Sequence, residues 1–390
     1  MNREAVIVDG ARLPSGRGGG ALSKITPEVF GGYLIQKLIE RSHIPKEEID
    51  DVILGNVMGV YLCFARLCLL HAGLPVEVPG VTLDRNCASG LQAIAFASQA
   101  IRCGEADLII AGGVESMTRQ PWTIDKPATA FPRGPLMPRI LSRMTAPKEY
   151  GECNMGETAE NVAERYHISK EEQDQLVVES HLRAFRAWEE GRFREEVISY
   201  PLPNPKGAPI LFEKDETIRV STLEDISSLP TIFKKGGTVT AASSSPFTDG
   251  AAAVVMMSRS KAEKLGINPI ARVVATASAG VEPAYMGMGP VPATRKVLER
   301  SGLKLEQIDL VEINEAFAAQ AIACCKELGL GREKVNVNGS GISLGHPIAA
   351  SGARMTTTLI FEMRRRKARY GLATMCVGGG QGTAVIYELI

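Results

Sequence analysis

Two cysteines and one histidine stand in contexts that packing alone does not require. Cys87 opens a predicted apolar helix, and His346 lies between Gly345 and Pro347. Cys376 ends a predicted strand and precedes the glycine-rich run 378–382. A thiol at a helix start, a histidine on a tight loop and a second thiol beside bare backbone are groups that acyl transfer through a thioester needs. These residue types and their settings therefore predict cysteine-based acyl transfer.

Cys87 is the predicted nucleophile. A free cysteine is often no more than a small buried apolar residue. A thiol in the first turn of a helix, however, meets the positive end of the helix dipole, which lowers its pKa from about 8.5 and favours the thiolate. Ser89, Gly90 and the apolar stretch 91–95 follow Cys87 as such a helix would. We therefore expect Cys87 to have a lowered pKa and to attack a thioester carbonyl.

The surroundings of His346 and Cys376 fit the same chemistry. Glycines near His346 suit a base that takes a proton from a thiol, or a donor to a carbonyl oxygen. The run after Cys376 could be a phosphate-binding loop, but Thr383 stands where the third glycine of the dinucleotide fingerprint belongs, and a strand follows instead of a helix. Its glycines instead allow backbone N–H groups to approach a substrate oxygen. Asn314, between a predicted strand and a predicted helix, is either a helix N-cap or a ligand for an oxyanion or a water.

The composition limits the classes of partner. The chain has 390 residues, of which 45% are hydrophobic, and its 44 basic and 44 acidic residues cancel. This neutrality argues against nucleic acid as the main partner. The basic cluster at 364–369 falls at the end of a predicted helix, where complementing the helix dipole is favoured over binding an anion. No apolar run reaches the ~18 residues of a membrane span, so no membrane contact is expected.

Cysteine usage indicates the compartment. The eight cysteines form no Cys-x-x-Cys pair and the five histidines have no zinc-ligand spacing, so no metal is expected. Such a chain is typical of a reducing, intracellular environment. Because a strand is predicted from residue 5 onward, no leader peptide is expected, and the cytoplasm is the expected location.

A repeat is visible within the chain. Residues 40–52 match residues 299–311, 259 positions later, in Glu, Arg, Ser, Glu, Ile, Asp and Val. Each copy has a predicted helix before it and a predicted strand after it, and this shared order indicates a duplication. The predicted helices are 27–42 and 293–301, and the predicted strands are 52–54 and 310–313.

Strands alternate with helices in both copies, which predicts mostly parallel sheets covered on both faces. Residues from about 118 to 245 break the alternation with Pro- and Gly-rich segments and a capping box from Ser169 to Glu172, and are expected to form a loop domain over the active face. The expected units are an N-terminal half (1–117 and 246–268), the loop domain (118–245) and a C-terminal half (269–390). Further strands are predicted at 107–111, 271–275, 334–337 and 372–376, and further helices from residue 87, at 315–328 and through 356–363.

Six segments together resemble the thiolase family. They are NCASG (86–90), GGVESM (112–117), MGETAEN (155–161), NEAFA (314–318), GHP (345–347) and CVGGG (376–380), spread over essentially the whole chain. The resemblance implies an α/β protein with a five-layered α/β/α/β/α fold of two duplicated halves and an inserted loop domain. It implies an acetyl-CoA acetyltransferase or 3-ketoacyl-CoA thiolase that uses acetyl-CoA, acyl-CoA and CoA as substrates without a permanently bound cofactor. It also implies a homodimer or a homotetramer.

The resemblance implies a role for each site residue. Cys87, deprotonated with help from His346, becomes acylated in a ping-pong mechanism. Cys376 then moves a proton at the α-carbon of acetyl-CoA in condensation, or at the CoA thiol in thiolysis. His346 and a water held by Asn314 form one oxyanion hole, and the N–H groups of Cys87 and Gly378 form the other. The substrate and CoA contacts are expected from Ser245, Met155, Phe317 and, at the nucleotide end, Arg219.

The chain departs from the family pattern around these residues. The bulky segment Val60–Phe64 fills a loop that is usually Gly-, Gln- or Asn-rich, and we expect it to narrow the site or to rebuild the subunit contact. Changes in supporting residues can alter a rate about tenfold or more. Asn154 stands where enzymes tuned to acetoacetyl-CoA often carry His, so chain length stays open. The other departures are Asp84 for Asn, Ala242-Ser243 for Gly-Asn, Thr248 for Asn, and Ser340 and Ala349 for glycine.

Two other functions compete with the thiolase hypothesis. A decarboxylating synthase of the same fold uses His in place of the second cysteine, so Cys376 argues against it. An acyl-CoA-binding relative with reduced or lost activity is the alternative, because Val60–Phe64 and Ser243 alter the surroundings of the site. Trapping an acyl group on Cys87 would distinguish the thiolase from this acyl-CoA-binding relative. The direction of the reaction depends on metabolite levels and not on these residues.

Overall fold

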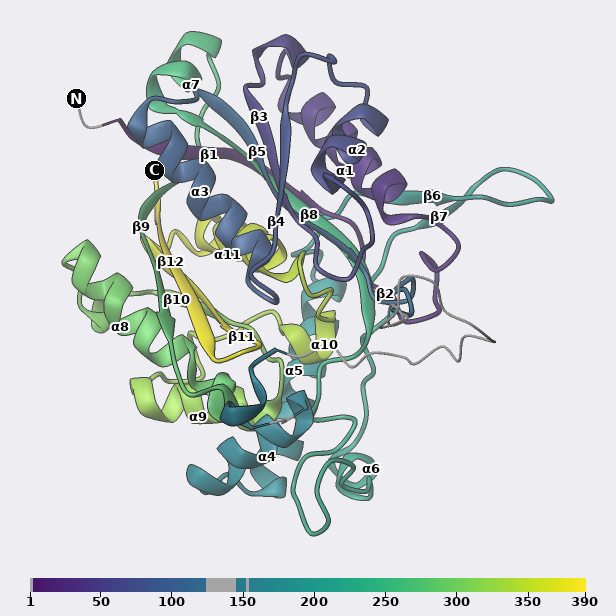
Figure 1. Cartoon of the computed structure of the whole chain (residues 1–390), viewed down its shortest axis with the longest axis vertical. Helices are drawn as coiled ribbons and strands as arrows, with labels where there is room; N and C mark the ends of the chain where they lie inside the picture. Colours follow the sequence, from purple (N-terminus) through teal and green to yellow (C-terminus); the bar gives the residue numbers. More distant parts are fainter. Residues whose placement is uncertain (1–2, 124–144, 152–153) are drawn as a thin grey trace, which may run out of the picture.

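The computed structural model describes residues 3–123, 145–151 and 154–390, and within them ten strands join in one mixed sheet. The strand order is β10-β11-β12-β9-β1-β8-β5-β3-β4, and the short strand β2 (Gly16–Arg17) pairs with β8. Figure 1 shows helices on the outer faces of the molecule and between the two halves of the sheet.

The first half of the sheet is built from five strands in the order β4-β3-β5-β8-β1. Strand β3 lies parallel to β4 and β5, whereas β8 is antiparallel to both β5 and β1. The strands are β1 (Ala5–Arg12), β3 (Asp51–Gly55), β4 (Gly80–Leu83), β5 (Leu108–Ser116) and β8 (Thr248–Ser258).

The second half repeats this topology as β10-β11-β12-β9. Strand β10 is parallel to β11, and β12 is antiparallel to β11 and β9. Val335 forms a parallel bridge to Val311, in the place that β4 takes in the first half. A short antiparallel pairing of β1 with β9 joins the halves. The strands are β9 (Ala271–Gly280), β10 (Leu310–Ile313), β11 (Tyr370–Val377) and β12 (Gln381–Leu389).

Six helices complete the layers, and three apolar clusters hold them to the sheet halves. Helices α1 (Pro27–Ser42) and α2 (Phe64–His71) cover the first half, and α8 (Pro290–Ser301) and α9 (Ala318–Leu328) cover the second. Helices α3 (Ser89–Cys103) and α11 (Ser351–Arg366) pack against each other between the halves (Figure 1). The layers thus follow the expected α/β/α/β/α order.

The repeat seen in the sequence is preserved in the backbone. Helices α1 and α8 end at equivalent positions, and the residue after each, His43 or Gly302, has a positive φ of 53° or 70°. The Asp50 carboxylate accepts the N–H groups of residues 107 and 108, and the equivalent Asp309 accepts those of residues 369 and 370. The two halves are therefore copies of one helix–turn–strand design.

The remaining elements lie around these layers, some at the top of Figure 1 and others at its bottom. A buried ion cluster ties part of them to β1, because Arg12 pairs with Glu196 and Asp215 at 2.7 Å each. The β6–β7 hairpin projects from the body (Figure 1). These elements are α4 (Met155–Arg165), α5 (Lys170–Glu189), β6 (Tyr200–Leu202), β7 (Ile210–Phe212), α6 (Leu223–Ser227), α7 (Arg259–Leu265) and α10 (Gly341–Leu344).

Several local predictions can be compared with these elements. The capping box from Ser169 to Glu172 is present at the start of α5. The strand predicted at 334–337 was wrong, since only isolated bridges, at Val335 and Val337, form there. In the basic cluster, Arg364 pairs with Glu195, and its two neighbours pair with Glu362. No helix among the described residues is long and apolar enough to cross a membrane.

Candidate active site

Cys87 lies on a tight turn just before α3. The turn is held by Asn86, which has a positive φ of 44°. The Asn86 N–H donates to Asp84 Oδ1 at 2.7 Å, and its side-chain Nδ2 donates to the carbonyl oxygen of Gly378 at 3.1 Å. Because Gly378 belongs to the second half of the chain, this contact brings the two cysteine loops together.

The prediction of a lowered pKa for Cys87 was wrong. Helix α3 begins only at Ser89, so Cys87 lies before its first turn. Desolvation by burial raises the pKa of Cys87 to about 11, although the N–H groups of Gly378 and of Cys87 itself act in the opposite direction. Burial disfavours the charged thiolate more than these backbone donors favour it. The free thiol is therefore neutral near pH 7.

Cys376 is fully buried at the end of β11, beside the turn that carries Gly378. Its pKa is raised well above the usual value, first by burial and then by the neighbouring Cys87. The side chains packed around it are apolar and include Met286 and Phe317. Cys87 and Cys376 are thus close enough that their ionisations are coupled.

His346 is buried on the loop after α10, and polar groups contact it from three elements. Its Nδ1 lies 2.5 Å from Ser351 Oγ, at the start of α11. Its backbone N–H donates to Thr248 Oγ1 of β8 at 3.2 Å. Asn314 Nδ2 lies 3.4 Å from both ring nitrogens. Burial, together with the charge of Arg354, lowers the pKa of His346 to about 3, so the imidazole is neutral.

Asn314 does not cap a helix, which corrects one of the two roles considered for it. Helix α9 starts at Ala318 with Phe317 as its N-cap residue. The backbone of Asn314 instead continues from β10, and its N–H donates to the carbonyl oxygen of Thr374 at 3.1 Å. Its buried Oδ1 has no hydrogen-bond partner among the described residues. This oxygen can therefore accept a hydrogen bond from a water or a ligand.

The sequence motifs gave no role for Glu115, although it holds two loops of the site together. Its buried carboxylate accepts the N–H of Met58 at 3.0 Å and the N–H of Ala349 at 3.2 Å. These two hydrogen bonds fix the loop after β3 and the loop that follows His346. The signal available in the sequence was an acidic residue directly after the glycines and valine of the segment GGVESM (112–117).

A cleft of about 280 Å³ leads away from this centre. Ser244 and Pro246 line it, and Ser245, between them, donates its N–H to Ala316 at 2.9 Å, close to Asn314. Arg219 lines the same cleft. The cleft therefore connects the predicted nucleotide-end residue to a segment that contacts the catalytic loops.

Met155 and Phe317 lie nearer to the thiols than to this cleft. Met155 starts α4, and a Cβ placed on Gly378 would lie 3.6 Å from its sulfur. Phe317 packs in the apolar cluster of Cys376 and meets Phe233 edge to face, with ring centroids 6.2 Å apart. These two residues thus border the reacting centre, whereas Arg219 does not.

His181 also lines this cleft, and no sequence motif singled it out. It is buried on α5, and its Nδ1 accepts the backbone N–H of Arg219 at 3.1 Å. Burial, followed by the charge of Arg219, lowers its pKa to about 4. His181 therefore holds the Arg219 backbone as a neutral acceptor, a long-range contact that no local pattern reveals.

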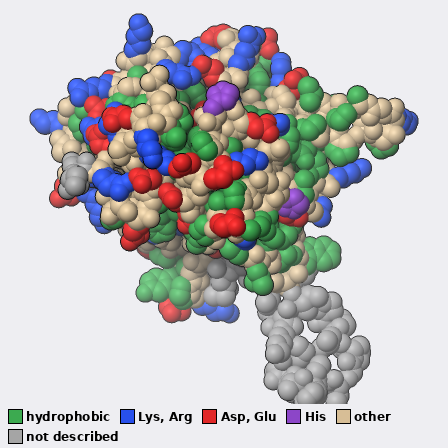
Figure 2. Space-filling model, turned by 90° about the horizontal axis from the view of Figure 1, so that it is seen from above, with side chains coloured by type: hydrophobic (Ala, Val, Ile, Leu, Met, Phe, Trp, Pro, Cys, Tyr) green, Lys and Arg blue, Asp and Glu red, His purple; other side chains and the backbone are tan. Residues whose placement is uncertain are grey.

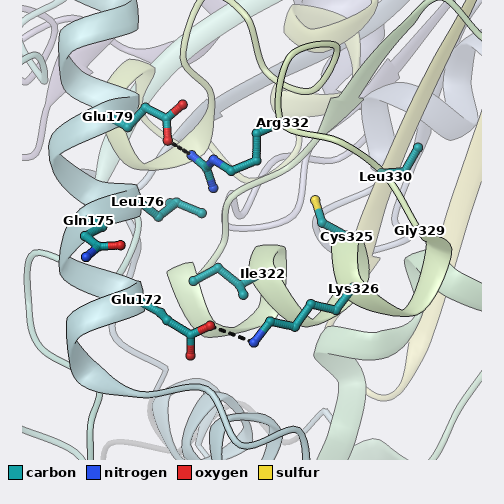
Figure 3. A pocket seen from close by; sticks show the side chains of 10 residues that line it. All are labelled: Glu172, Gln175, Leu176, Glu179, Ile322, Cys325, Lys326, Gly329, Leu330 and Arg332. Carbon is teal, nitrogen blue, oxygen red and sulfur yellow. Dashed lines mark hydrogen bonds and ion pairs between the residues drawn. The ribbon is translucent and has the colours of Figure 1, made fainter.

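A larger cavity of about 400 Å³ lies elsewhere, between α5 and α9 (Figure 3). Leu176, Ile322 and Cys325 contribute apolar surface, and two ion pairs, Glu172–Lys326 and Glu179–Arg332, span it (Figure 3). None of the residues named above as catalytic candidates lines this cavity. Its charged groups already pair with each other, whereas the smaller cleft is lined by Arg219, the residue predicted at the nucleotide end of CoA.

The departures from the family pattern have local explanations. Asp84 accepts the Asn86 N–H through a carboxylate oxygen, as an Asn side-chain oxygen would. Thr248 supplies the acceptor for the His346 N–H. In the Val60–Phe64 segment, Phe64 is buried in α2, whereas 68% of Val60 and 92% of Leu62 are exposed. These two side chains therefore face solvent and not the thiols.

Acidic and basic side chains are intermixed over the face shown in Figure 2. Among the described residues, no group of three or more His, Cys, Asp or Glu side chains could hold a metal ion.

Comparisons with known proteins show the family. The thiolase N-terminal domain matches residues 5–260, and the thiolase C-terminal domain matches residues 267–389. The chain is 44% identical to the acetyl-CoA acetyltransferase of Syntrophomonas wolfei and 46% identical to the 3-oxoadipyl-CoA/3-oxo-5,6-dehydrosuberyl-CoA thiolase of Escherichia coli, over 100% of each chain. The crystal structure of the Bacillus anthracis acetyl-CoA acetyltransferase matches over 100% of both chains, with a TM-score of 0.94 and 40% identity. The chain belongs to the thiolase family.

Proposed function

We propose that the protein is an acetyl-CoA C-acyltransferase that moves acyl groups between CoA thioesters through an acyl-cysteine at Cys87. The observation that carries this proposal is the convergence of two coupled thiols with the N–H of Gly378. His346 and Asn314 form the second polar cluster. Acetyl-CoA, acyl-CoA and CoA are the substrates, and the cytoplasm is the proposed location.

The first half-reaction acylates Cys87. Its sulfur attacks the thioester carbonyl of acyl-CoA, its proton passes to His346, and the proton then goes to the departing CoA sulfur. The N–H groups of Cys87 and Gly378 face the Cys87 sulfur and are placed to stabilise the carbonyl oxygen as it becomes negative. Because thiol and imidazole are both neutral at the start, proton transfer accompanies the attack.

In the second half-reaction, Cys376 first passes its own proton to His346 and then takes the α-proton of acetyl-CoA. The resulting carbanion attacks the acyl group, and the Cys87 sulfur leaves with the proton that His346 returns. Burial and the proximity of Cys87 both oppose ionisation of Cys376. Acylation turns Cys87 into a thioester that cannot ionise, so that Cys376 no longer has a second ionisable thiol beside it. The two half-reactions are thereby ordered.

Ser351 allows His346 to serve both half-reactions. Its hydroxyl lies 2.5 Å from His346 Nδ1 and 3.2 Å from the carbonyl oxygen of Pro347. When the hydroxyl donates to the carbonyl oxygen of Pro347, its oxygen accepts a hydrogen bond from Nδ1–H. The proton of the neutral imidazole is then on Nδ1, and Nε2 is free to act as a base. When the hydroxyl donates to Nδ1, Nε2 carries the proton and can donate to an enolate oxygen, together with a water bound to Asn314 Oδ1.

The surroundings of Cys376 favour an uncharged acyl chain. The neighbouring side chains in its cluster are Ala159, Val239, Met286, Ala316 and Phe317, with Met155 and Phe233 packed against them. An acyl chain that ends in a carboxylate would lose its hydration there without gaining a cation. The proposed substrates therefore have uncharged, apolar acyl groups.

We also propose a homodimer, or a homotetramer built from it, through the edge of the sheet at β4. Among the described residues, this strand is the last in the sheet and has no strand on its outer side. Exposed apolar side chains lie close to it in the chain, among them Leu62, Val76 and Val81. Pairing with a second copy would cover both features. The proline-containing segment around Pro132, a further candidate for a subunit contact, lies outside the described residues.

The deciding experiment is the intact mass of the protein after incubation with acetyl-CoA. Wild type should gain one acetyl group, which free CoA removes, and Cys87→Ser should gain none. Cys376→Ser should still gain the acetyl group but form no acetoacetyl-CoA. Cys325→Ser provides the matched control, because this half-buried cysteine lies in the other cavity and should behave as wild type.

The acyl-CoA-binding alternative predicts the opposite mass result. A folded wild-type protein that binds acetyl-CoA but acquires no acetyl group would contradict the enzyme proposal and support that alternative. Acetylation at a cysteine other than Cys87 would contradict the assigned nucleophile.

A further inference from the structure

The cleft of about 280 Å³ contains two guanidinium groups, from Arg17 and Arg219. Both side chains are exposed, and neither has an ion pair or a side-chain hydrogen bond to any described residue; the hydrogen bonds of these two residues are made by their backbone groups. Most other arginines on the described surface pair with a carboxylate, as Arg41 does with Asp9. Two free cations on one concave surface indicate an anionic ligand.

The other ionisable residues of the cleft do not neutralise these cations. His181 is uncharged near pH 7, because burial and the charge of Arg219 lower its pKa to about 4. Asp225 is the one carboxylate among the lining residues, and it is engaged in a capping box at the start of α6. Its Oδ2 accepts hydrogen bonds from the N–H and the hydroxyl of Thr222. The cleft therefore keeps a net positive charge.

The backbone at Arg17 is fixed, although its side chain is free. Arg17 lies in β2 opposite Thr248, the residue that accepts the His346 N–H. Its own N–H donates to Glu216 Oε2 at 3.0 Å, and the same oxygen accepts the N–H of Ala21. Arg17 thus lies on the β2–β8 strand pair, which also positions the catalytic histidine through Thr248. Its guanidinium is available to a ligand in the cleft.

We propose that Arg17 is a second phosphate-binding residue of this site and that it increases affinity for CoA beyond what Arg219 provides. This inference rests on the proposed function, which places CoA in the cleft. CoA carries a diphosphate and a 3′-phosphate, and a guanidinium fork binds phosphate oxygens in a bidentate manner. Two separate arginines match two separate phosphate groups, while Ser244 and Pro246 lead from the cleft toward the thiols.

The test measures the dissociation constant of CoA by calorimetry for wild type, Arg17→Gln, Arg17→Lys and the control Arg186→Gln. Arg186 is an exposed arginine of α5 that does not line the cleft. We expect the constant to rise about fivefold in Arg17→Gln, as for loss of an exposed charge-assisted contact, and to change less than about twofold in the control. Arg17→Lys should fall between them, because it keeps the charge but loses the fork.

Dephospho-CoA identifies the phosphate group involved. If the effect of Arg17→Gln disappears with dephospho-CoA, Arg17 binds the 3′-phosphate; if it persists, Arg17 binds the diphosphate. S-acetyl-pantetheine, which has neither group, should acetylate Cys87 at the same rate in wild type and Arg17→Gln. If Arg17→Gln lowers the rate of Cys87 acetylation by this substrate as strongly as it weakens CoA binding, the effect of the substitution is structural and the proposal is overturned.

The binding readout separates this inference from the proposed function. An unchanged CoA dissociation constant in Arg17→Gln, with normal acetylation of Cys87, overturns the role of Arg17 and leaves the acyltransferase intact. A wild-type protein that binds CoA more tightly than Arg17→Gln but never becomes acetylated supports the role of Arg17 and contradicts the acyltransferase. A wild-type protein that does not bind CoA contradicts both.

Discussion

At the scale of single residues, the free enzyme keeps both partners of the proposed proton transfer neutral. Burial raises the pKa of Cys87 to about 11 and lowers that of His346 to about 3. A preformed thiolate–imidazolium pair is therefore unfavourable, unlike the activated thiolate that a helix-start cysteine implies. The thioester must be bound before the proton moves, which protects the nucleophile from other electrophiles in the cell.

This arrangement predicts how alkylation of Cys87 depends on pH. Because only the thiolate reacts, the rate with iodoacetamide should keep rising from about pH 7 to about pH 10, as the pH approaches the raised pKa. Rates measured by mass spectrometry of the Cys87 peptide provide the check. A plateau near pH 8 would show that the thiol is activated in the free enzyme.

Asp84 should contribute to this pKa. Its carboxylate raises the pKa of Cys87, after burial and together with Glu115. Asp84→Asn keeps an acceptor for the Asn86 N–H but removes the charge, so alkylation at pH 8 should become about threefold faster. Glu105→Gln, an exposed change at the far end of α3, serves as the control. An unchanged rate in Asp84→Asn would exclude this charge effect.

At the scale of elements, the site depends on close contacts between loops of the two halves. Gly345 ends α10 with a φ of 83°, and a Cβ there would lie 2.7 Å from both Cγ2 and Oγ1 of Thr248. The Thr248 hydroxyl accepts the N–H of His346. A side chain at residue 345 would therefore strain the backbone and displace the group that holds the catalytic histidine.

Gly345→Ala should thus reduce both stability and activity. We expect the free energy of unfolding in urea to fall by about 2–3 kcal/mol, from the left-handed backbone plus the clash, and kcat to fall about tenfold or more. Gly302→Ala is the matched control, because Gly302 has a φ of 70° and a Cβ there would have no neighbouring atom within 4 Å. It should lose about 1 kcal/mol and keep its kcat. Equal kcat values in the two variants would contradict the positioning role of the 345 turn.

At the scale of the whole molecule, the duplication leaves the two ends of the sheet unequal. Beside β10, Val335 forms a parallel bridge to Val311. At the other end, β4 is the last strand, and Leu62 and Val81 beside it are exposed by 92% and 45%. An apolar strand edge of this kind is typical of a subunit interface.

Charges at this edge should therefore separate the subunits. Leu62→Glu combined with Val81→Lys should shift the mass measured by light scattering from a dimer or tetramer toward a monomer, because burying these charges is unfavourable. Phe185→Glu, on the exposed side of α5, should leave the assembly unchanged. A wild-type protein that is already monomeric, or a variant that stays assembled, would place the interface elsewhere.

Short-range patterns allowed the family and much of the fold to be predicted. The 259-residue repeat, the strand–helix alternation and the six motif segments depend on local periodicity and on glycine positions, which the chain displays directly. The predictions that failed were also local in origin. Helix α9 starts at Ala318 and not at Glu315, and Cys87 precedes α3, because packing between the halves decides where each chain segment becomes helical.

The amino-acid sequence by itself determined which reactive groups this protein has and which family it belongs to, because those properties depend on residue type and order. Only the tertiary structure decided their protonation and their partners. Burial sets the pKa values of Cys87 and His346, and residues far apart in the chain supply the contacts of Thr248 with His346 and of His181 with Arg219. Desolvation and long-range hydrogen bonds depend on everything that packs around a group, and no local pattern contains that information.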